Sequence, residues 1–305
     1  MADDVLSKPR LDLYGEITKR IAAAIQAGPC EFKAPWHIPA GHAALPTNAL
    51  THADYRGINI LNLWIEAQLR GYANNLWASY RQWKELGAQV RRGERGSLVV
   101  FYKRTETSPT EPEDPDRSRK LKVFAKASWV FNVSQVDNFQ PVTPPSVTPI
   151  EGCNEVEAFV EALCPIIQHG FVRACYRRDT DTIEMPERGW FLPETGRPPQ
   201  EAYYAVLLHE LTHWSGAPHR LNRRFGQRFG DDAYAMEELV AELGAAFLCA
   251  AVGLSTEPRP DHAAYVASWL KVLGRDPKAL FFAASRAQEA AEFMTYLATG
   301  IIPRE

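Results

Sequence analysis

The pattern of apolar and polar positions along this 305-residue chain predicts mainly helices, with a few short strands between them. Helix-compatible apolar runs occupy residues 10–26, 59–70, 77–86, 156–168, 203–216, 234–248, 260–273 and 277–296. Extended runs rich in Leu, Val, Phe and Tyr occupy residues 97–103 and 121–133, and residues 171–176 and 182–185 are predicted to form a hairpin. The predicted fold class is therefore α+β.

A proline-rich segment divides the chain in two. Residues 140–149 contain four prolines, which stiffen the backbone and remove hydrogen-bond donors. We therefore expect a linker at 141–150, between a small α+β domain at 1–140 and a mainly helical domain with a small sheet at 151–305. A chain of this length with 46% apolar residues is long enough to form two cores.

The sequence shows no sign of export or of a membrane span. It has no basic start followed by an apolar segment, and no run approaches the roughly 18 apolar residues of a spanning helix. Its five cysteines are odd in number and lack C-x-x-C spacing, so we interpret them as reduced thiols. These observations predict a soluble cytoplasmic protein without a membrane partner.

One helical run carries the clearest chemistry. His209 and His213 lie four residues apart in a His-Glu-x-x-His motif, so on a helix both imidazoles can reach one metal ion. Glu210, next to the first histidine, is the candidate general base of a hydrolase. The apolar residues before the motif and Gly216 after it support a helix that ends just past the motif. The alternative is an amphipathic helix with two histidines on its surface.

A catalytic zinc ion usually has three protein ligands, so a third is expected elsewhere in the chain. Glu237, Glu238 and Glu242 lie within an apolar helical run, where buried acids need compensation. Glu238 and Glu242 share a helix face, whereas Glu237 is turned by about 100° from Glu238. We assign Glu238 as the third ligand and Glu242 as the carboxylate that accepts the ring N–H of a ligating histidine. The spacing alone leaves the choice among the three open. The expected cofactor is one Zn²⁺ ion, or another divalent metal.

This pair of helices resembles the zincin metallopeptidases that use a downstream glutamate as third ligand. The resemblance implies that the two helices pack on a small twisted sheet with the metal between them. It also implies that residues 183–186 and 189–191 are extended pieces at a sheet edge that holds a peptide substrate.

The N-terminal third has a different character from the rest of the chain. Residues 1–104 contain 14 Lys and Arg against 9 Asp and Glu, whereas the remainder contains 20 against 28. The same third holds four of the eight tryptophans. Cations interleaved with aromatic rings suit single-stranded nucleic acid, because the cations follow the phosphates while the rings stack on unpaired bases. The alternative is that the rings belong to the core.

Five short motifs then point to a family. They are PTN at 46–48, YRGIN at 55–59, WASYRQ at 77–82, VRRGERG at 90–96 and VFNVSQ at 130–135. Their order and spacing resemble the N-terminal domain of ArdC-type antirestriction proteins and plasmid TraC-type primases. The HELTHWSG stretch and the YAMEELVAELGAAF helix resemble the metallopeptidase-like second domain of ArdC-type proteins. The resemblance implies binding of single-stranded DNA and protection of incoming plasmid or mobile-element DNA from host restriction.

Candidate DNA contacts follow from these motifs and from residue type. The predicted phosphate contacts are Arg56, Arg91, Arg92, Arg95 and Lys103, and the predicted stacking platforms are Tyr55, Trp77 and Tyr80. Asn48, Asn59 and Gln82 are able to hydrogen-bond bases or sugars, but they are equally suited to capping turns.

Two functions of different class fit these features. The first is an antirestriction protein that coats single-stranded DNA and carries a zinc-dependent metallopeptidase-like domain. The second is a zinc metallopeptidase that cleaves a protein substrate, for example a restriction enzyme, and uses DNA only for targeting. A primase is the weakest hypothesis, because no polymerase-type cluster of acidic residues is evident.

Overall fold

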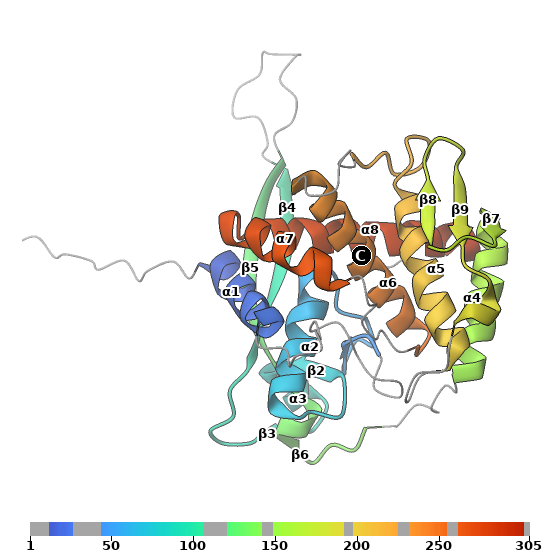
Figure 1. Cartoon of the computed structure of the whole chain (residues 1–305). Helices are drawn as coiled ribbons and strands as arrows, with labels where there is room; N and C mark the ends of the chain where they lie inside the picture. Colours follow the sequence, from blue (N-terminus) through green and yellow to red (C-terminus); the bar gives the residue numbers. More distant parts are fainter. Residues whose placement is uncertain are drawn as a thin grey trace, which may run out of the picture.

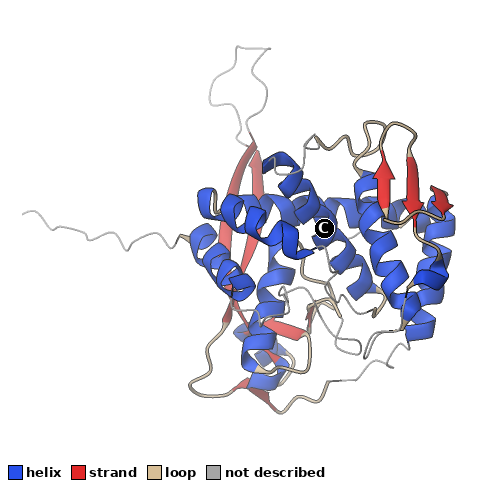
Figure 2. Ribbon diagram, viewed as in Figure 1, coloured by secondary structure: helices blue, strands red, loops and turns tan. Residues whose placement is uncertain are grey.

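The computed structural model describes residues 12–26, 44–106, 121–141, 149–191, 198–224, 232–254 and 262–301. The fold class is α+β, as predicted (Figure 1 and Figure 2). The N-terminal region combines helices with a curled four-stranded sheet, and the C-terminal region is largely helical with a three-stranded sheet at one end. Within these described ranges, no helix is long and apolar enough to cross a membrane.

The N-terminal sheet has the strand order β1-β2-β5-β4. The strands are β1 (Thr47–Asn48), β2 (Leu76–Ser79), β5 (Leu121–Asn132) and β4 (Ser97–Glu106). The long antiparallel pair β4 and β5 confirms the two strands predicted here, with Ser97 opposite Val130. Helix α1 (Leu13–Gln26) and helix α2 (Ile58–Arg70) place their apolar residues in one core with β4. Both helices were predicted from their apolar spacing.

Two asparagines of α2 form hydrogen bonds with backbone groups at the edge of this sheet. Strand β4 is the outer strand, so one side of its backbone has no strand partner in the sheet. The Asn59 side chain donates to the Val100 carbonyl and accepts from the Val100 N–H, both at 2.8 Å. Asn62 donates to the Leu98 carbonyl at 2.6 Å. Because buried backbone groups need partners, these contacts fix α2 on the sheet.

The predicted helix over residues 77–86 is wrong in its first part. Residues 76–79 form β2, and helix α3 (Tyr80–Glu85) begins only after Ser79. The Ser79 hydroxyl accepts from the Gln82 N–H, and the Gln82 side chain accepts from the Ser79 N–H, a capping box that starts the helix there. The strand depends on nonlocal pairing, because β2 lies between β1 and β5. Beyond α3, β3 (Gln89–Val90) pairs with β6 (Val136–Asp137).

In its described residues, the C-terminal region is built from five α-helices and a small sheet. The helices are α4 (Pro149–Leu163), α5 (Pro199–Ser215), α6 (Asp232–Ala251), α7 (His262–Arg275) and α8 (Ala279–Thr299). The sheet has the order β7-β9-β8, with β7 (Ile166–His169), β9 (Thr182–Met185) and β8 (Cys175–Arg177). In Figure 1, α5 runs beside α6, and the small sheet lies on the other side of α5.

Three sequence expectations for this region need correction. The helix predicted at 156–168 ends at Leu163, and residues 166–169 form a strand because they pair in parallel with β9. Residues 188–190 form a short 3-10 helix, not an extended piece. Strand β9 is paired on both sides, so it offers no edge to a peptide; the outer strands are β7 and β8. The predicted pairing of 171–176 with 182–185 is confirmed for β8 and β9, but β8 covers only residues 175–177, and residues 171–174 are not in a strand.

The predicted linker is described only in part. Residues 142–148 lie outside the described residues, and residues 149–150 already belong to α4. The boundary between the two domains stays a prediction.

Helix α6 lies at the centre of the fold, because it contributes to two hydrophobic cores. Leu243 and Phe247 pack with side chains of α1, α2, α7 and α8 in the first core. Leu248 and Cys249 pack with side chains of α5 in the second. The first core therefore joins the N-terminal and C-terminal regions, and within it the rings of Trp64 and Phe247 have centroids 6.1 Å apart.

We expect the two regions to unfold together, because they share this core. Phe247 is 3% exposed, and replacing a buried phenylalanine by alanine destabilises a protein by about 3–5 kcal/mol. Calorimetry of Phe247→Ala should show one transition at lower temperature. The control Phe282→Ala removes a ring that is 53% exposed and should change stability by less than about 0.5 kcal/mol. Two separate transitions, of which only one moves, would contradict the shared core.

Candidate metal centre

Helix α5 carries the His-Glu-x-x-His motif into the interior of the C-terminal region. The helix begins at Pro199, whose fixed φ suits the first helical position, and it ends before Gly216. His209 and Glu210 are buried, and His213 is mostly buried. The motif therefore lies in a helix, as predicted, but it faces the core and not the solvent. The alternative of two histidines on a surface helix does not hold.

Helix α6 approaches α5 closely at Gly244. A Cβ atom at Gly244 would lie 2.6 Å from Thr212 Cγ2 and 2.8 Å from Thr212 Oγ1. Real Cβ atoms essentially never make contacts under 3.0 Å, so only glycine permits this separation of the two helices. Thr212 lies next to His213 on α5. The close approach brings the carboxylates of α6 within reach of the histidines of α5.

His209, His213 and Glu238 form the group that can hold a metal ion. One donor atom from each lies within 4.8 Å of the others. Glu238 Oε2 is 3.5 Å from His209 Nε2, and Glu238 Oε1 is 3.6 Å from His213 Nε2. Two imidazole nitrogens and a carboxylate oxygen directed at one point are a common donor set for a divalent cation with a remaining open position. The geometry thus agrees with the assignment of Glu238 as third ligand.

The second ring nitrogen of each histidine faces a further carboxylate. His209 Nδ1 lies 3.6 Å from Glu242 Oε2, longer than a hydrogen bond but facing the residue predicted for this role. His213 Nδ1 lies 3.2 Å from Glu237 Oε1, within hydrogen-bond distance. Such outer carboxylates orient ligating histidines and fix the tautomer. Each ligating histidine therefore has a carboxylate of its own on α6.

Glu237 was one of the three candidate ligands, but sequence reasoning missed its contact with His213 and its partner Arg223. Arg223 donates to Glu237 Oε1 at 2.9 Å and to Ser215 Oγ at 2.8 Å, and it also donates to the Thr212 carbonyl. The guanidinium thereby compensates a buried carboxylate and holds the segment after α5 against the end of that helix. The sequence clue to this role was the rotation of about 100° between Glu237 and Glu238 on a helix. Because of this rotation, Glu237 faces Nδ1 of His213 while Glu238 faces Nε2.

Two of the donors, His213 and Glu238, have shifted pKa values. Burial by itself would lower the pKa of His213, but contacts with Glu237 and Glu238 outweigh burial and raise the pKa to about 10. Burial by itself would raise the pKa of Glu238, but contacts with His209 and His213 hold it well below its usual range. A cation that binds here must therefore displace a proton from His213.

Glu210 extends from α5 to the small sheet. Its Oε2 accepts a 2.9 Å hydrogen bond from the backbone N–H of Tyr176 in β8. Strand β8 pairs with β9 on its other side, so Glu210 lies at the outer edge of the sheet. Among the described residues, the group of possible ligands does not include Glu210. The role of Glu210 as general base stays a prediction. Because Glu210 is not one of the possible metal ligands, its position is compatible with that role.

Comparisons with known proteins agree with both halves of this arrangement. A family model described as the N-terminal domain of anti-restriction factor ArdC matches residues 11–131, and one described as a zincin-like metallopeptidase matches residues 154–286. The metal-free crystal structure of the antirestriction ArdC protein from plasmid R388 is 36% identical to this chain. The match covers 95% of this chain and 99% of that chain, with a TM-score of 0.74. The chain belongs to the ArdC family of antirestriction proteins.

Other relatives extend the picture of this ArdC-family protein. The Mn(II)-bound structure of the R388 protein is 35% identical and covers the same shares of both chains, 95% and 99%, with a TM-score of 0.73. The uncharacterized protein y4eC of Sinorhizobium fredii (strain NBRC 101917 / NGR234) is 44% identical over 96% of this chain and 95% of its own length. Two proteins named DNA primase TraC, from Escherichia coli, are 32% identical over 95% and 94% of this chain, which spans only 27% and 20% of their lengths.

Two of the predicted stacking residues of the ArdC-type N-terminal domain are buried. Tyr55 is 6% exposed and Trp77 is fully buried, and both rings pack in one core with Val99 and Val130. Burial raises the pKa of Tyr55 to about 12, and the Tyr55 hydroxyl accepts from the Asn48 side chain at 3.2 Å. A ring enclosed in the core offers no face to a base, so these positions do not agree with a stacking role.

The predicted phosphate contacts fall into two groups. Arg56 forms an ion pair with Glu292 of α8. Arg91 pairs with Glu94 at 3.1 Å and donates to the Ser134 carbonyl. Both guanidinium groups therefore form ion pairs with acids of the same chain, although both side chains are partly exposed.

The remaining candidates are exposed or only partly described. Arg92 and Arg95 are exposed and make no ion pair with any residue that the structure describes. Tyr80, a predicted stacking platform, is 50% exposed. Lys103 lies in β4, but its side chain is outside the described part of the chain.

The three polar residues with open roles all make backbone contacts. Asn48 accepts from the N–H groups of Leu50 and Thr51 at 3.0 Å each, which caps the turn after β1. Asn59 binds the edge of β4, and Gln82 belongs to the capping box of α3. Their structural roles account for their presence in the motifs.

Glu237→Gln should weaken metal binding about 10- to 100-fold, because it removes the charge that orients His213. The change keeps the size of the side chain, so the fold should persist. Titration of zinc against a chelating dye measures the affinity. The control Glu161→Gln alters an exposed carboxylate on α4 and should leave the affinity unchanged. Equal affinities for Glu237→Gln and wild type would show that Glu237 does not orient His213.

Gly244→Ala should also weaken metal binding, because its Cβ would meet Thr212 at under 3.0 Å and separate α5 from α6. Adding Thr212→Ala removes the two nearest atoms and should restore much of the affinity. Gly274→Ala serves as control, because a Cβ there has no atom within 4 Å. The same zinc titration applies. Failure of the double variant to recover would mean that helix separation is not what sets the affinity.

Proposed function

We propose that this protein binds single-stranded DNA through its N-terminal region and protects incoming plasmid or mobile-element DNA from host restriction. The observation that carries the proposal is the match to the R388 antirestriction protein over 99% of that chain, which includes both regions. The ArdC-type N-terminal domain and its similarity to proteins named DNA primase add support. Because the chain spans about a quarter or less of those primases, we do not extend primase activity to it.

We further propose that the C-terminal region is a zinc metallopeptidase. His209, His213 and Glu238 would hold the ion, and Glu237 and Glu242 would orient the two histidines. A bound zinc ion would supply Lewis-acid activation of water and of a scissile carbonyl. Glu210 would act as general base.

The position of Glu210 favours a peptide as the substrate of such a site. Its carboxylate is hydrogen-bonded to the outer strand β8, and an outer strand can pair with an extended peptide. A peptide paired with β8 at Tyr176 would take the place of Glu210 at the Tyr176 N–H and lie next to its carboxylate.

The alternative function is a DNA-associated metallopeptidase whose biological output is cleavage of a protein substrate. The observation that favours this alternative is that the site has both a set of three metal donors and a candidate general base. A zinc ion with a purely structural role normally has four protein ligands and no use for a general base, whereas this site combines three donors with Glu210. In this alternative, DNA binding only brings the peptidase to its substrate.

Glu210→Gln distinguishes the two functions. If the protein protects DNA by coating it, this variant should protect a plasmid entering a restricting host as well as the wild type does, since Glu210 lies in the other region. Transfer efficiency into restricting and non-restricting cells, at matched protein levels, measures protection. Glu161→Gln is the control for charge. Loss of protection in Glu210→Gln, with zinc affinity retained, would favour the peptidase alternative.

A further inference from the structure

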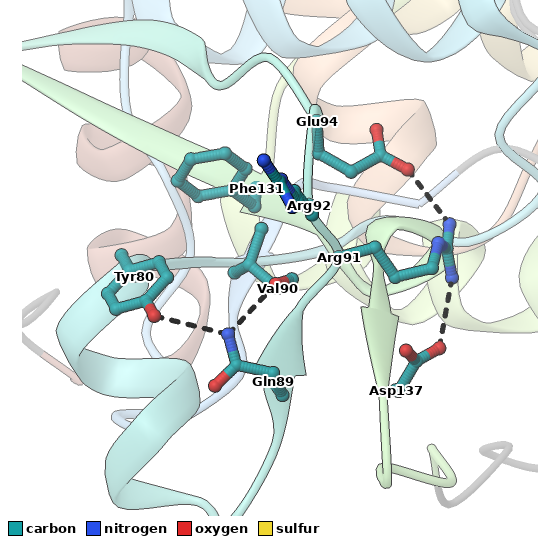
Figure 3. Close-up of a pocket in the computed structure, with 8 residues that line it drawn as sticks. All are labelled: Tyr80, Gln89, Val90, Arg91, Arg92, Glu94, Phe131 and Asp137. Carbon is teal, nitrogen blue, oxygen red and sulfur yellow. Dashed lines mark hydrogen bonds and ion pairs between the residues drawn. The ribbon is translucent and has the colours of Figure 1, made fainter.

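A hollow of about 510 Å³ lies between α3, the turn after β3 and the end of β5 (Figure 3). Its lining residues are Tyr80, Gln89, Val90, Arg91, Arg92, Glu94, Phe131 and Asp137. The volume is in the range that holds a small ligand or one unit of a polymer. The lining includes neither the buried rings of Tyr55 and Trp77 nor any residue of the metal centre.

Aromatic rings gather at this hollow and continue beyond it along β5. Tyr80 is 50% exposed, and its hydroxyl accepts from the Gln89 side chain at 3.1 Å, which fixes the ring at the rim. Phe131 is partly buried in the wall. Trp129, two residues earlier on the same strand, leaves the same face and is 55% exposed. Two largely exposed rings, Tyr80 on α3 and Trp129 on β5, therefore flank the partly buried ring of Phe131.

Gly96 lets the basic turn lie directly against these rings. A Cβ atom at Gly96 would be 3.2 Å from Phe131 Cζ and 3.2 Å from Trp129 Cβ, tighter than nearly all real contacts. Gly96, which ends the basic turn of residues 91–96, therefore lies against Trp129 and Phe131. Arg92 of the same turn and Phe131 line one hollow.

One arginine at this hollow forms ion pairs with both of its acids. Arg91 points away from the rings toward Glu94 and Asp137, at 3.1 Å and 3.5 Å (Figure 3). Arg92 and Arg95 are exposed, and neither has an ion-pair partner among the residues described. Arg92 lines the hollow together with Phe131, and Arg95 directly precedes Gly96, which lies against Trp129 and Phe131.

We infer that this aromatic–basic surface, defined as Tyr80, Trp129, Phe131, Arg92 and Arg95, is where single-stranded DNA binds. One unpaired base occupies the hollow beside Tyr80 and Phe131, a neighbouring base stacks on Trp129, and Arg92 and Arg95 contact the phosphates. A duplex is excluded because its bases are already stacked and paired. The inference rests on the proposed DNA binding, and it gives the stacking role to residues other than Tyr55 and Trp77.

The first test measures stacking. The full chain is titrated into a labelled oligothymidylate of about 20 nucleotides, longer than one binding site. Trp129→Ala and Tyr80→Ala should each weaken binding on the order of 10-fold, and Trp129→Phe should restore most of the loss because the ring remains. Trp190→Ala removes a tryptophan that is 56% exposed in the C-terminal region and should bind like wild type.

The second test measures phosphate contacts by salt dependence. Each phosphate contact on a single strand contributes about 0.7 to the slope of log affinity against log salt concentration. The double variant Arg92→Ala with Arg95→Ala should therefore lower the slope by about 1.4. Arg173→Ala with Lys271→Ala removes the same charge from exposed positions in the C-terminal region and should leave the slope unchanged.

The outcomes separate the surface from the function. If the wild type binds the oligonucleotide and all surface variants bind equally well, the aromatic–basic surface is wrong while DNA binding stands. If the wild type fails to bind, the proposed function falls together with the surface. If thymidine monophosphate competes as strongly as the oligonucleotide, the hollow is a site for free nucleotides, and a strand interface is ruled out.

Discussion

The structure depends on one constraint: helix α6 is enclosed on nearly all sides and yet carries three buried carboxylates, Glu237, Glu238 and Glu242. Apolar side chains of α6 enter both main cores, so the helix has almost no solvent-facing surface. A buried carboxylate is tolerated only with compensating partners. The two histidines of α5 supply them for Glu238, and Arg223 supplies one for Glu237. The side chains of the metal centre thus stabilise the buried carboxylates of α6 and allow the helix to pack in the core. The same side chains form the candidate metal site.

Enclosing α6 also binds the N-terminal region to the metal centre. Trp64 on α2 packs near Phe247 on α6, and Arg56, just before α2, pairs with Glu292 on α8. A shift of the N-terminal helices would therefore be transmitted to the helix that carries Glu238, because close-packed interiors transmit strain. The motif YRGIN, predicted to contact DNA through Arg56, instead contributes to this junction. Its glycine N–H donates to Gln288 of α8 at 3.1 Å.

Sequence reasoning succeeded where the constraint is local and failed where it depends on tertiary pairing. The four-residue spacing of His209 and His213 fixes their common face on any helix, and an acid such as Glu238 in an apolar run signals compensation. The role of Glu237 was missed because its partner Arg223 comes from a loop whose position no spacing reveals. Trp77 was wrongly predicted to lie in a helix and to stack on DNA. Its burial results from the pairing of β2 with β1 and β5, which the local sequence does not show. Trp129, by contrast, is exposed although it lies in an apolar strand, since nothing described covers that end of its face.

The distribution of charge keeps the two proposed activities apart. The N-terminal third carries an excess of five cations, with Arg92 and Arg95 uncompensated at the aromatic–basic surface, whereas the remainder carries an excess of eight acids. A polyanion is attracted to the first and repelled by the second over distances of about 10 Å at 0.1 M salt. Within the metal centre, the cationic groups of histidine and arginine are paired with buried glutamates. They are therefore not available to bind a phosphate. A neutral or cationic peptide segment suits that region better than DNA does. The rigid shared core would then hold a DNA strand on one region and a peptide on the other at a fixed separation.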